Sequence, residues 1–157
     1  MSTRPGAGRG ARTDNDPFGL ARFVAAQDAG RAYQRALGEL RSGRKASHWM
    51  WFIFPQVAGL GFSDMAQRYA ISGLAEARAY LAHPVLGPRL LACTRAVAAA
   101  EGSTADEILG PVDAMKLRSS MTLFAAAAPG EPAFTQVLAR FFDGQPDQAT
   151  LARLTPE

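Results

Sequence analysis

The chain has 157 residues, of which 48% are hydrophobic and 20% are charged, and this balance is typical of a single globular domain. The one cysteine, Cys93, excludes a disulfide within the chain, and its apolar helical surroundings predict a small buried filler. Two histidines far apart in sequence do not favour a metal centre, so neither a metal nor a cofactor is predicted. A net charge of +3 is too small for a general nucleic-acid coat, so nucleic acid is not a favoured partner.

Residues 1–16 are rich in glycine, alanine and arginine and offer little to bury, which predicts a disordered N-terminal tail before one globular domain over 17–157. The tail lacks the apolar stretch of a secretory signal, and a run of about 18 apolar residues is found nowhere in the chain. We therefore expect a cytoplasmic protein with no membrane-spanning segment. The oligomeric state stays open.

Helical periodicity dominates the domain, whereas the alternation typical of strands is scarce. The apolar spacing predicts helices over 18–27, 30–42, 66–69, 74–82, 84–100, 111–128 and 133–142, and a last one that begins near Pro146. Thr104 and Glu107 match a capping box, which predicts a further helix start. The predicted fold is all-α, a compact single-domain bundle of about seven to nine short helices around a central aromatic helix. A small sheet within 50–64 is the alternative.

The most apolar run, residues 47–56, contains both tryptophans and one of the two histidines. Both of its faces are apolar, and no second strand-like run lies nearby, so we favour a buried central helix that Ser47 caps and that ends before Pro55. The simplest interpretation is that this helix only fills the core. The functional interpretation is that one edge, His48 with Trp49 or Trp51, lines a pocket in which an indole ring stacks on a ligand.

Positive charge is concentrated just before this run, since residues 31–45 carry five basic side chains against the single acid Glu39. Arg44 and Lys45 directly precede the aromatic residues and are candidates to hold a phosphate or a carboxylate. The same basic segment is alternatively a docking surface for an acidic protein or for RNA.

A second group of polar residues interrupts the apolar face of the helix predicted over 111–128. Asp113, Lys116 and Ser120 project from one side of this helix at 100° per residue. One interpretation is an ordinary Asp113–Lys116 pair on a solvated edge. The other is a site in which Lys116 binds an anion and Ser120 hydrogen-bonds the ligand, because charges at a buried face must be paired.

Several blocks of the sequence resemble the bacterial family of unknown function numbered 1810, and the match spans residues 17–154. The blocks are 23–27, 43–56, 66–71, 83–87 and 116–124. The resemblance implies a compact, mostly helical, single-domain cytoplasmic protein without an established activity. Some relatives carry the label calpastatin, which the composition of a folded domain does not support. A more distant likeness is to YbiA-type domains, thought to act on ADP-ribose derivatives or phosphorylated N-glycosides.

Two functional hypotheses follow. The first is a small enzyme or ligand-binding domain for a phosphorylated small molecule, with nucleotide and ADP-ribose derivatives as the class. Its candidate residues are, for catalysis, His48 and Lys116, and, for ligand binding, Arg44, Lys45, Trp49, Trp51, Gln56 and Ser120, with Gln27 as a further neutral partner. The second is a non-catalytic protein- or RNA-interaction module that uses residues 31–45. The sequence does not decide whether a reaction is catalysed.

Overall fold

The computed structural model describes residues 16–100 and 103–154. The tail predicted over 1–16 lies outside the described residues except for Asp16. The carboxylate of Asp16 accepts the backbone N–H groups of Leu20 at 2.6 Å and Ala21 at 2.9 Å. Asp16 therefore belongs to the first turn of the domain.

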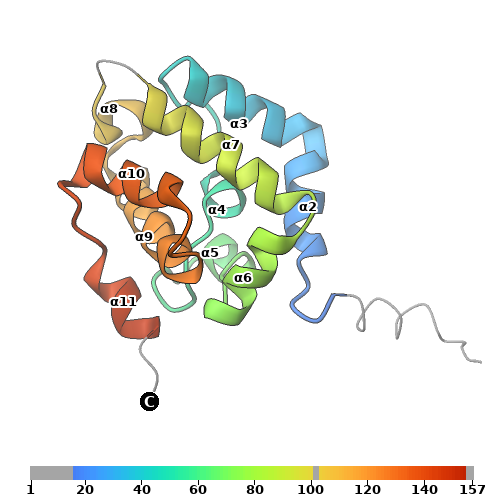
Figure 1. Cartoon of the computed structure of the whole chain (residues 1–157). Helices are drawn as coiled ribbons and strands as arrows, with labels where there is room; N and C mark the ends of the chain where they lie inside the picture. Colours follow the sequence, from blue (N-terminus) through green and yellow to red (C-terminus); the bar gives the residue numbers. More distant parts are fainter. Residues whose placement is uncertain (1–15, 101–102, 155–157) are drawn as a thin grey trace, which may run out of the picture.

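Helices follow one another along the described part of the chain, and no β-strand is found in it (Figure 1). In chain order they are α2 Ala21–Asp28, the 3₁₀ turn η1 Ala29–Arg31, α3 Ala32–Arg41, α4 Met50–Ile53, α5 Asp64–Arg68, α6 Leu74–Ala82, α7 Leu86–Ala99, α8 Ala105–Leu109, α9 Pro111–Ala127, α10 Pro132–Phe142 and α11 Gln148–Leu154. The prediction of an all-α, compact single-domain fold is confirmed. None of the described helices is both long enough and apolar enough to cross a membrane.

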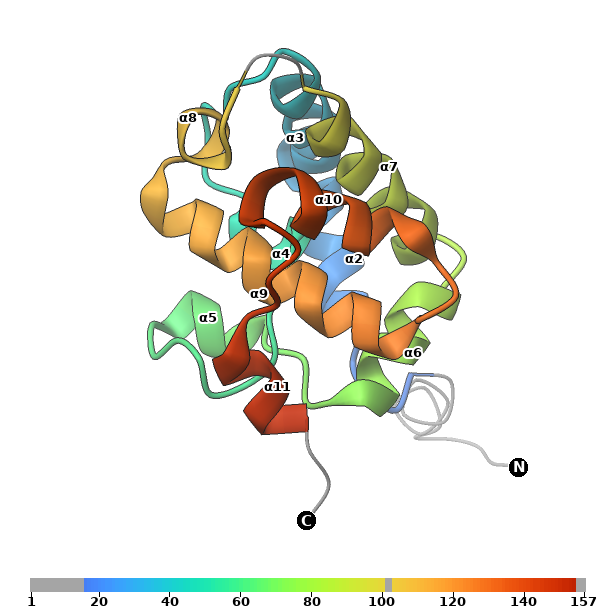
Figure 2. The same ribbon diagram turned by 60° about the vertical axis from the view of Figure 1, so that its left-hand side comes forward.

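The longest helix, α9, organises the bundle, because α6, α8, α10 and α11 all pack against it. Figure 2 shows α9 running through the middle of the molecule, with α10 above it and α11 below it in this view. Its inward residues Leu117, Met121 and Phe124 are fully buried. The Phe124 ring lies 5.4 Å from the Tyr80 ring of α6 and 5.8 Å from the Phe134 ring of α10, between ring centroids. Apolar burial on this scale is the main stabilising contribution to the fold.

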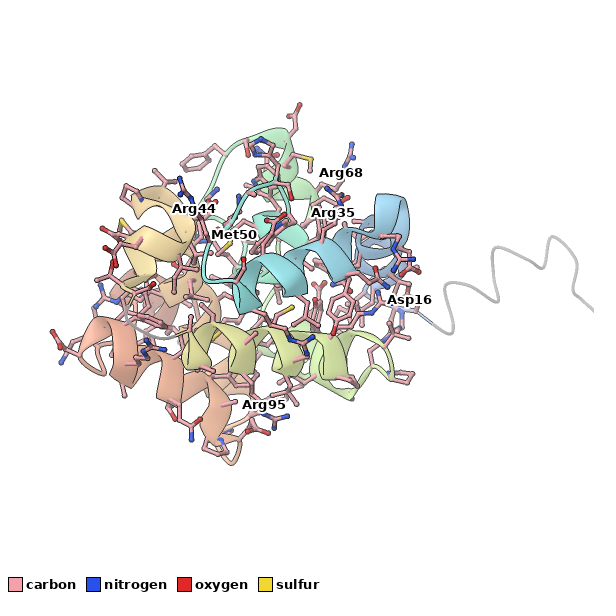
Figure 3. All side chains as sticks on the ribbon, turned by 90° about the horizontal axis from the view of Figure 1, so that it is seen from above. Asp16, Arg35, Arg44, Met50, Arg68 and Arg95 are labelled. Carbon is pink, nitrogen blue, oxygen red and sulfur yellow. The ribbon has the colours of Figure 1, made fainter. Side chains whose placement is uncertain are left out.

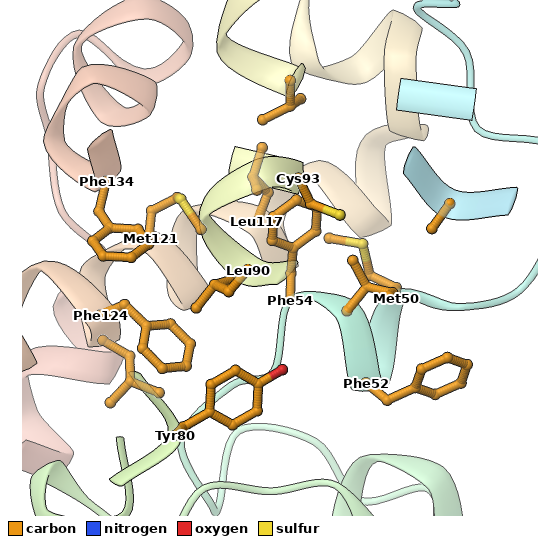
Figure 4. Packing of buried hydrophobic residues seen from close by; sticks show 14 of the residues in the cluster. Met50, Phe52, Phe54, Tyr80, Leu90, Cys93, Leu117, Met121, Phe124 and Phe134 are labelled. Carbon is orange, nitrogen blue, oxygen red and sulfur yellow. The ribbon is translucent and has the colours of Figure 1, made fainter. Parts of the chain in front are cut away.

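The aromatic run lies in the core, as expected, but only four of its residues are helical. The structure corrects two details of the prediction. The helix α4 spans only Met50–Ile53. Its N-cap residue is Trp49 rather than the predicted Ser47, and Trp49 makes no side-chain capping hydrogen bond. The Ser47 hydroxyl instead donates to the carboxylate of Glu39 at 2.7 Å, which removes it from the helix end. As predicted, α4 ends before Pro55. Figure 4 shows Met50, Phe52 and Phe54 in the core beside side chains of α6, α7, α9 and α10.

The remaining helix predictions differ from the structure mainly at the ends. The capping box of Thr104 and Glu107 is present, and the helix over 74–82 has the predicted bounds. By contrast, α7 begins at Leu86, so Pro84 is not in its first turn; Nδ1 of His83 accepts the N–H groups of Val85 and Leu86 at this end.

The small sheet considered for 50–64 is reduced to a single parallel bridge between Val57 and Ile71. In this bridge, the backbone N–H of Ile71 donates to the carbonyl of Gln56, and the N–H of Ala58 donates to the carbonyl of Ile71.

Candidate functional site

Two lysines that are far apart in sequence share the carboxylate of Asp113. Nζ of Lys45 lies 3.1 Å from Oδ2 of Asp113, and Nζ of Lys116, one turn along α9, lies 3.5 Å from Oδ1. The three side chains are 11%, 19% and 27% exposed for Lys45, Asp113 and Lys116. Two positive charges therefore meet one negative charge in a partly buried place. We call Lys45, Asp113, Lys116 and the neighbouring Trp51 the lysine site.

Each ammonium group of the site also lies against an indole ring. Nζ of Lys45 is 5.2 Å from the ring centroid of Trp49, and Nζ of Lys116 is 5.4 Å from that of Trp51. Both distances are within the range of a cation–π attraction, which is strongest where water is excluded. The rings differ in burial, since Trp49 is 1% exposed whereas Trp51 is only partly buried. Trp51 therefore borders the surface, and Trp49 belongs to the core.

Glu39 holds the segment that carries Lys45 and Trp49 in place. Its carboxylate accepts the N–H groups of Ala46 and Ser47 at 2.7 and 3.1 Å, the Ser47 hydroxyl at 2.7 Å and the indole N–H of Trp49 at 2.8 Å. Burial alone would raise the pKa of Glu39, but these hydrogen bonds outweigh it and lower the pKa to about 2. The carboxylate is therefore charged at neutral pH and clamps residues 46–49 against α3.

The two lysines are held to different degrees. The backbone N–H of Lys45 donates to the carbonyl of Ile108 in α8 at 2.7 Å, so its main chain is fixed as well as its side chain. Lys116 projects from the second turn of α9, its side chain is more exposed, and its pair with Asp113 is the longer one. Lys116 is therefore the better placed of the two to turn toward a ligand.

The other predicted site residues differ in burial. Arg44 and His48 are exposed, and neither has a hydrogen bond or an ion pair from its side chain within the described chain. Figure 3 shows Arg44 at the same end of the molecule as α8. Gln56 is half-buried. Ser120, one turn beyond Lys116, is fully buried, and its Oγ has no hydrogen-bond partner among the described residues.

Two sequence expectations change in light of this geometry. The indole of Trp49 is enclosed by the core and already bonded to Glu39, so it offers no open face for a ligand to stack on. The amide of Gln27 is also enclosed: it donates to the carbonyl of Phe52 and to the Tyr80 hydroxyl and accepts from Arg89. Both residues are structural in this conformation, because their polar atoms are used inside the fold.

The basic side chains of segment 31–45 are in different surroundings. Lys45 is paired within the lysine site, and Nε of Arg35 donates to the carbonyl of Gly30. Arg41 turns toward α7. There it lines a groove of about 380 Å³ together with Arg95 and several alanines. Two cations of this segment, Lys45 and Arg35, thus already have partners within the chain.

The Asp113–Lys116 pair that the sequence offered as one interpretation is present, but sequence reasoning missed Lys45 as a second partner of Asp113. The pairing of Lys45 with Asp113 joins residues from distant segments, and no local spacing indicates it. Glu39 did carry a signal, because it is the single acid in an otherwise basic stretch. An acid in such a position stabilises the fold when nearby donors satisfy it.

Comparisons with known proteins agree with this fold. The model of a family described as a protein of unknown function, DUF1810, matches residues 17–154. The crystal structure of the conserved hypothetical protein Rv1873 from Mycobacterium tuberculosis is similar, with a TM-score of 0.87 and 51% sequence identity over 90% of this chain and 100% of that one. No curated protein matches the sequence significantly. The chain therefore belongs to the DUF1810 family, as its sequence blocks predicted.

Proposed function

We propose that the lysine site binds the anionic group of a phosphorylated small molecule, with Lys116 as its principal cation. The observation that carries this proposal is the charge balance: Lys45 and Lys116 share the single carboxylate of Asp113 while they are 11% and 27% exposed. A net positive charge with restricted access to water is stabilised by an anion that brings its own oxygen acceptors. Phosphate and carboxylate groups both supply such acceptors.

The neighbouring residues complete the proposed pocket. Arg44 is exposed and close in sequence to Lys45, so it would make a second contact to the anion. Trp51 supplies an apolar wall for a sugar or a base, and Gln56 a neutral hydrogen bond. Ser120 would form the floor, where its unpartnered hydroxyl gains a partner once a neighbouring side chain moves.

The ligand class follows from the combination of cations with an aromatic wall, which fits nucleotide and ADP-ribose derivatives. The likeness to YbiA-type domains, drawn from sequence, is a second reason to test ADP-ribose. An enzymatic role would assign proton transfer to His48 and Lys116, since both side chains carry exchangeable protons and His48 is exposed. Cytoplasmic residence, expected from composition, belongs to the same proposal.

The alternative function is a non-catalytic module that docks an acidic protein or RNA through residues 31–45. The ion pair of Lys45 with Asp113 and the hydrogen bond from Arg35 to Gly30 leave fewer free cations for such docking, and this favours the lysine site over it.

A thermal-shift panel with inorganic phosphate, AMP and ADP-ribose tests the proposal. A ligand at 100 times its Kd stabilises the fold by about 2.7 kcal/mol, which raises Tm by about 5 to 10 °C for a domain of this size. We expect a shift with at least one of these compounds in the wild type, and its loss in Lys116→Ala. Arg78→Gln is the matched control, because it removes an exposed cation of α6. Shifts that persist in Lys116→Ala would show that Lys116 does not bind the ligand. Breakdown of ADP-ribose is assayed in the same samples to test for an enzymatic role.

A further inference from the structure

The carboxylate of Asp113 lies where an incoming anion would be most stable. It belongs to the first turn of α9, at the positive end of the helix dipole. Gly110 caps this end without a side-chain hydrogen bond, and Pro111 has no N–H to offer. Both ammonium groups of the lysine site converge on the same carboxylate. Asp113 thus combines the contacts that a bound phosphate would require.

The two contacts of Asp113 are unequal, and this determines which one a ligand can replace. The contact with Lys45 is the shorter, at 3.1 Å, and it joins α9 to a segment that Glu39 and Ile108 also hold. The contact with Lys116 is 3.5 Å long, lies within one helix, and involves the more exposed lysine. An i,i+3 pair of this kind contributes little to stability, so its loss is easily offset by a ligand.

We infer that Asp113 is a resident anion of the lysine site, which competes with the ligand for Lys116 and so sets the affinity and charge preference of the site. This inference rests on the proposed function above. In the free protein Asp113 is shared by both lysines; on binding, it keeps Lys45 while Lys116 turns to the anionic group of the ligand. The carboxylate then remains close to the ligand and repels it in proportion to the charge of the ligand.

Removal of the Asp113 charge therefore has an unusual consequence. A variant that loses a helix-stabilising acid is expected to be less stable, yet it should bind anions more tightly. Coulomb repulsion by one charge at about 6 Å in partly screened surroundings corresponds to about fivefold in Kd for a singly charged group, and to about the square of this factor for a doubly charged one. The gain in affinity should thus be larger for a phosphate monoester than for a phosphate diester.

The experiment compares Asp113→Asn with the wild type by isothermal titration, with AMP and cyclic AMP as probes. These nucleotides share a base but differ in phosphate charge. Asp106→Asn is the control, because it removes an exposed acid of the neighbouring helix α8. We expect Asp113→Asn to bind both nucleotides more tightly and AMP by the larger factor, and Asp106→Asn to bind them as the wild type does.

Each outcome separates the two proposals. Binding by the wild type with equal or weaker binding by Asp113→Asn would overturn the role of Asp113 and leave the anion site intact. Absence of binding in both proteins would overturn the anion site itself, and the role of Asp113 with it. If Asp113→Asn does not fold, Asp113→Ser is titrated in its place, because it removes the same charge, keeps a short polar side chain in the first turn of α9 and leaves both lysines of the site present. A Kd for AMP above that of the wild type in this variant would overturn the inference.

Discussion

The carboxylate of Glu39 accepts the indole N–H of Trp49 at 2.8 Å and three further hydrogen bonds from residues 46 and 47. This one side chain of α3 fixes the entry into α4 and the position from which Lys45 reaches Asp113. Glu39 therefore positions Lys45 for the lysine site, although Glu39 is not itself part of that site.

Glu39→Gln should destabilise the protein by about 2 kcal/mol, because a neutral amide oxygen accepts weaker hydrogen bonds than a carboxylate does. In addition, the amide NH₂ group of glutamine would face the N–H and O–H donors of Ala46, Ser47 and Trp49. Urea unfolding followed by circular dichroism measures this. Asp106→Asn, an exposed change of equal charge, should stay within about 0.5 kcal/mol of the wild type. Equal stabilities of the two variants would refute the anchoring role of Glu39.

The pKa of Glu39 also predicts a response to acid. Its folded pKa of about 2 lies below the unfolded value of 4.5, so its contribution to stability is complete above the unfolded pKa and is lost as the pH falls toward the folded one. Stability measured between pH 6 and pH 2 should therefore decline less steeply in Glu39→Gln than in the wild type. Parallel curves would contradict the lowered pKa.

The two lysines should contribute unequally to the stability of the protein. Lys45→Gln leaves the partly buried Asp113 without its closer partner and should lower the free energy of unfolding by about 2 kcal/mol. Lys116→Gln removes a longer i,i+3 pair and should lower it by about 0.5 kcal/mol or less. Chemical denaturation checks both values, and the reverse order would show that Lys116 is the structural lysine.

Ser120→Ala should leave stability unchanged or raise it by about 1 kcal/mol, since the variant removes a buried hydroxyl that has no partner in the described chain. The same variant should weaken ligand binding if Ser120 forms the floor of the pocket. Thermal unfolding with and without AMP provides both readouts. A marked loss of stability in the absence of AMP would mean that the hydroxyl has a partner inside the fold.

Cys93 should be inert in the folded protein. It is fully buried on α7, and burial raises the pKa of its thiol to about 12, a change that the distant charges of Arg41 and Arg89 only partly oppose. Labelling with a thiol reagent at pH 8 should proceed only at the rate of unfolding. Immediate modification of the native protein would contradict the role of Cys93 as a core filler.

Local signals in the sequence predicted the features that depend on neighbouring residues. The helix over 74–82 and the capping box at Thr104 follow from spacing within one or two turns, and both are present. The shortness of α4 could not be predicted in this way, because the hydroxyl of Ser47 is drawn to Glu39 on the preceding helix. The ion pair of Lys45 with Asp113 could not be predicted from local spacing either, because it depends on the packing of α8 and α9 against residues 42–49.

The two indole N–H groups provide the most direct test of the anion site. We expect them to give separate nuclear magnetic resonance signals, since the chain has two tryptophans and the indole of Trp49 is bonded to Glu39. In a titration with ADP-ribose, the signal of Trp51 should move in a saturable manner and that of Trp49 should move far less, with both responses abolished in Lys116→Gln. Signals that remain in place throughout the titration, or that move equally in Lys116→Gln, would contradict an anion site built on Lys116 and Trp51.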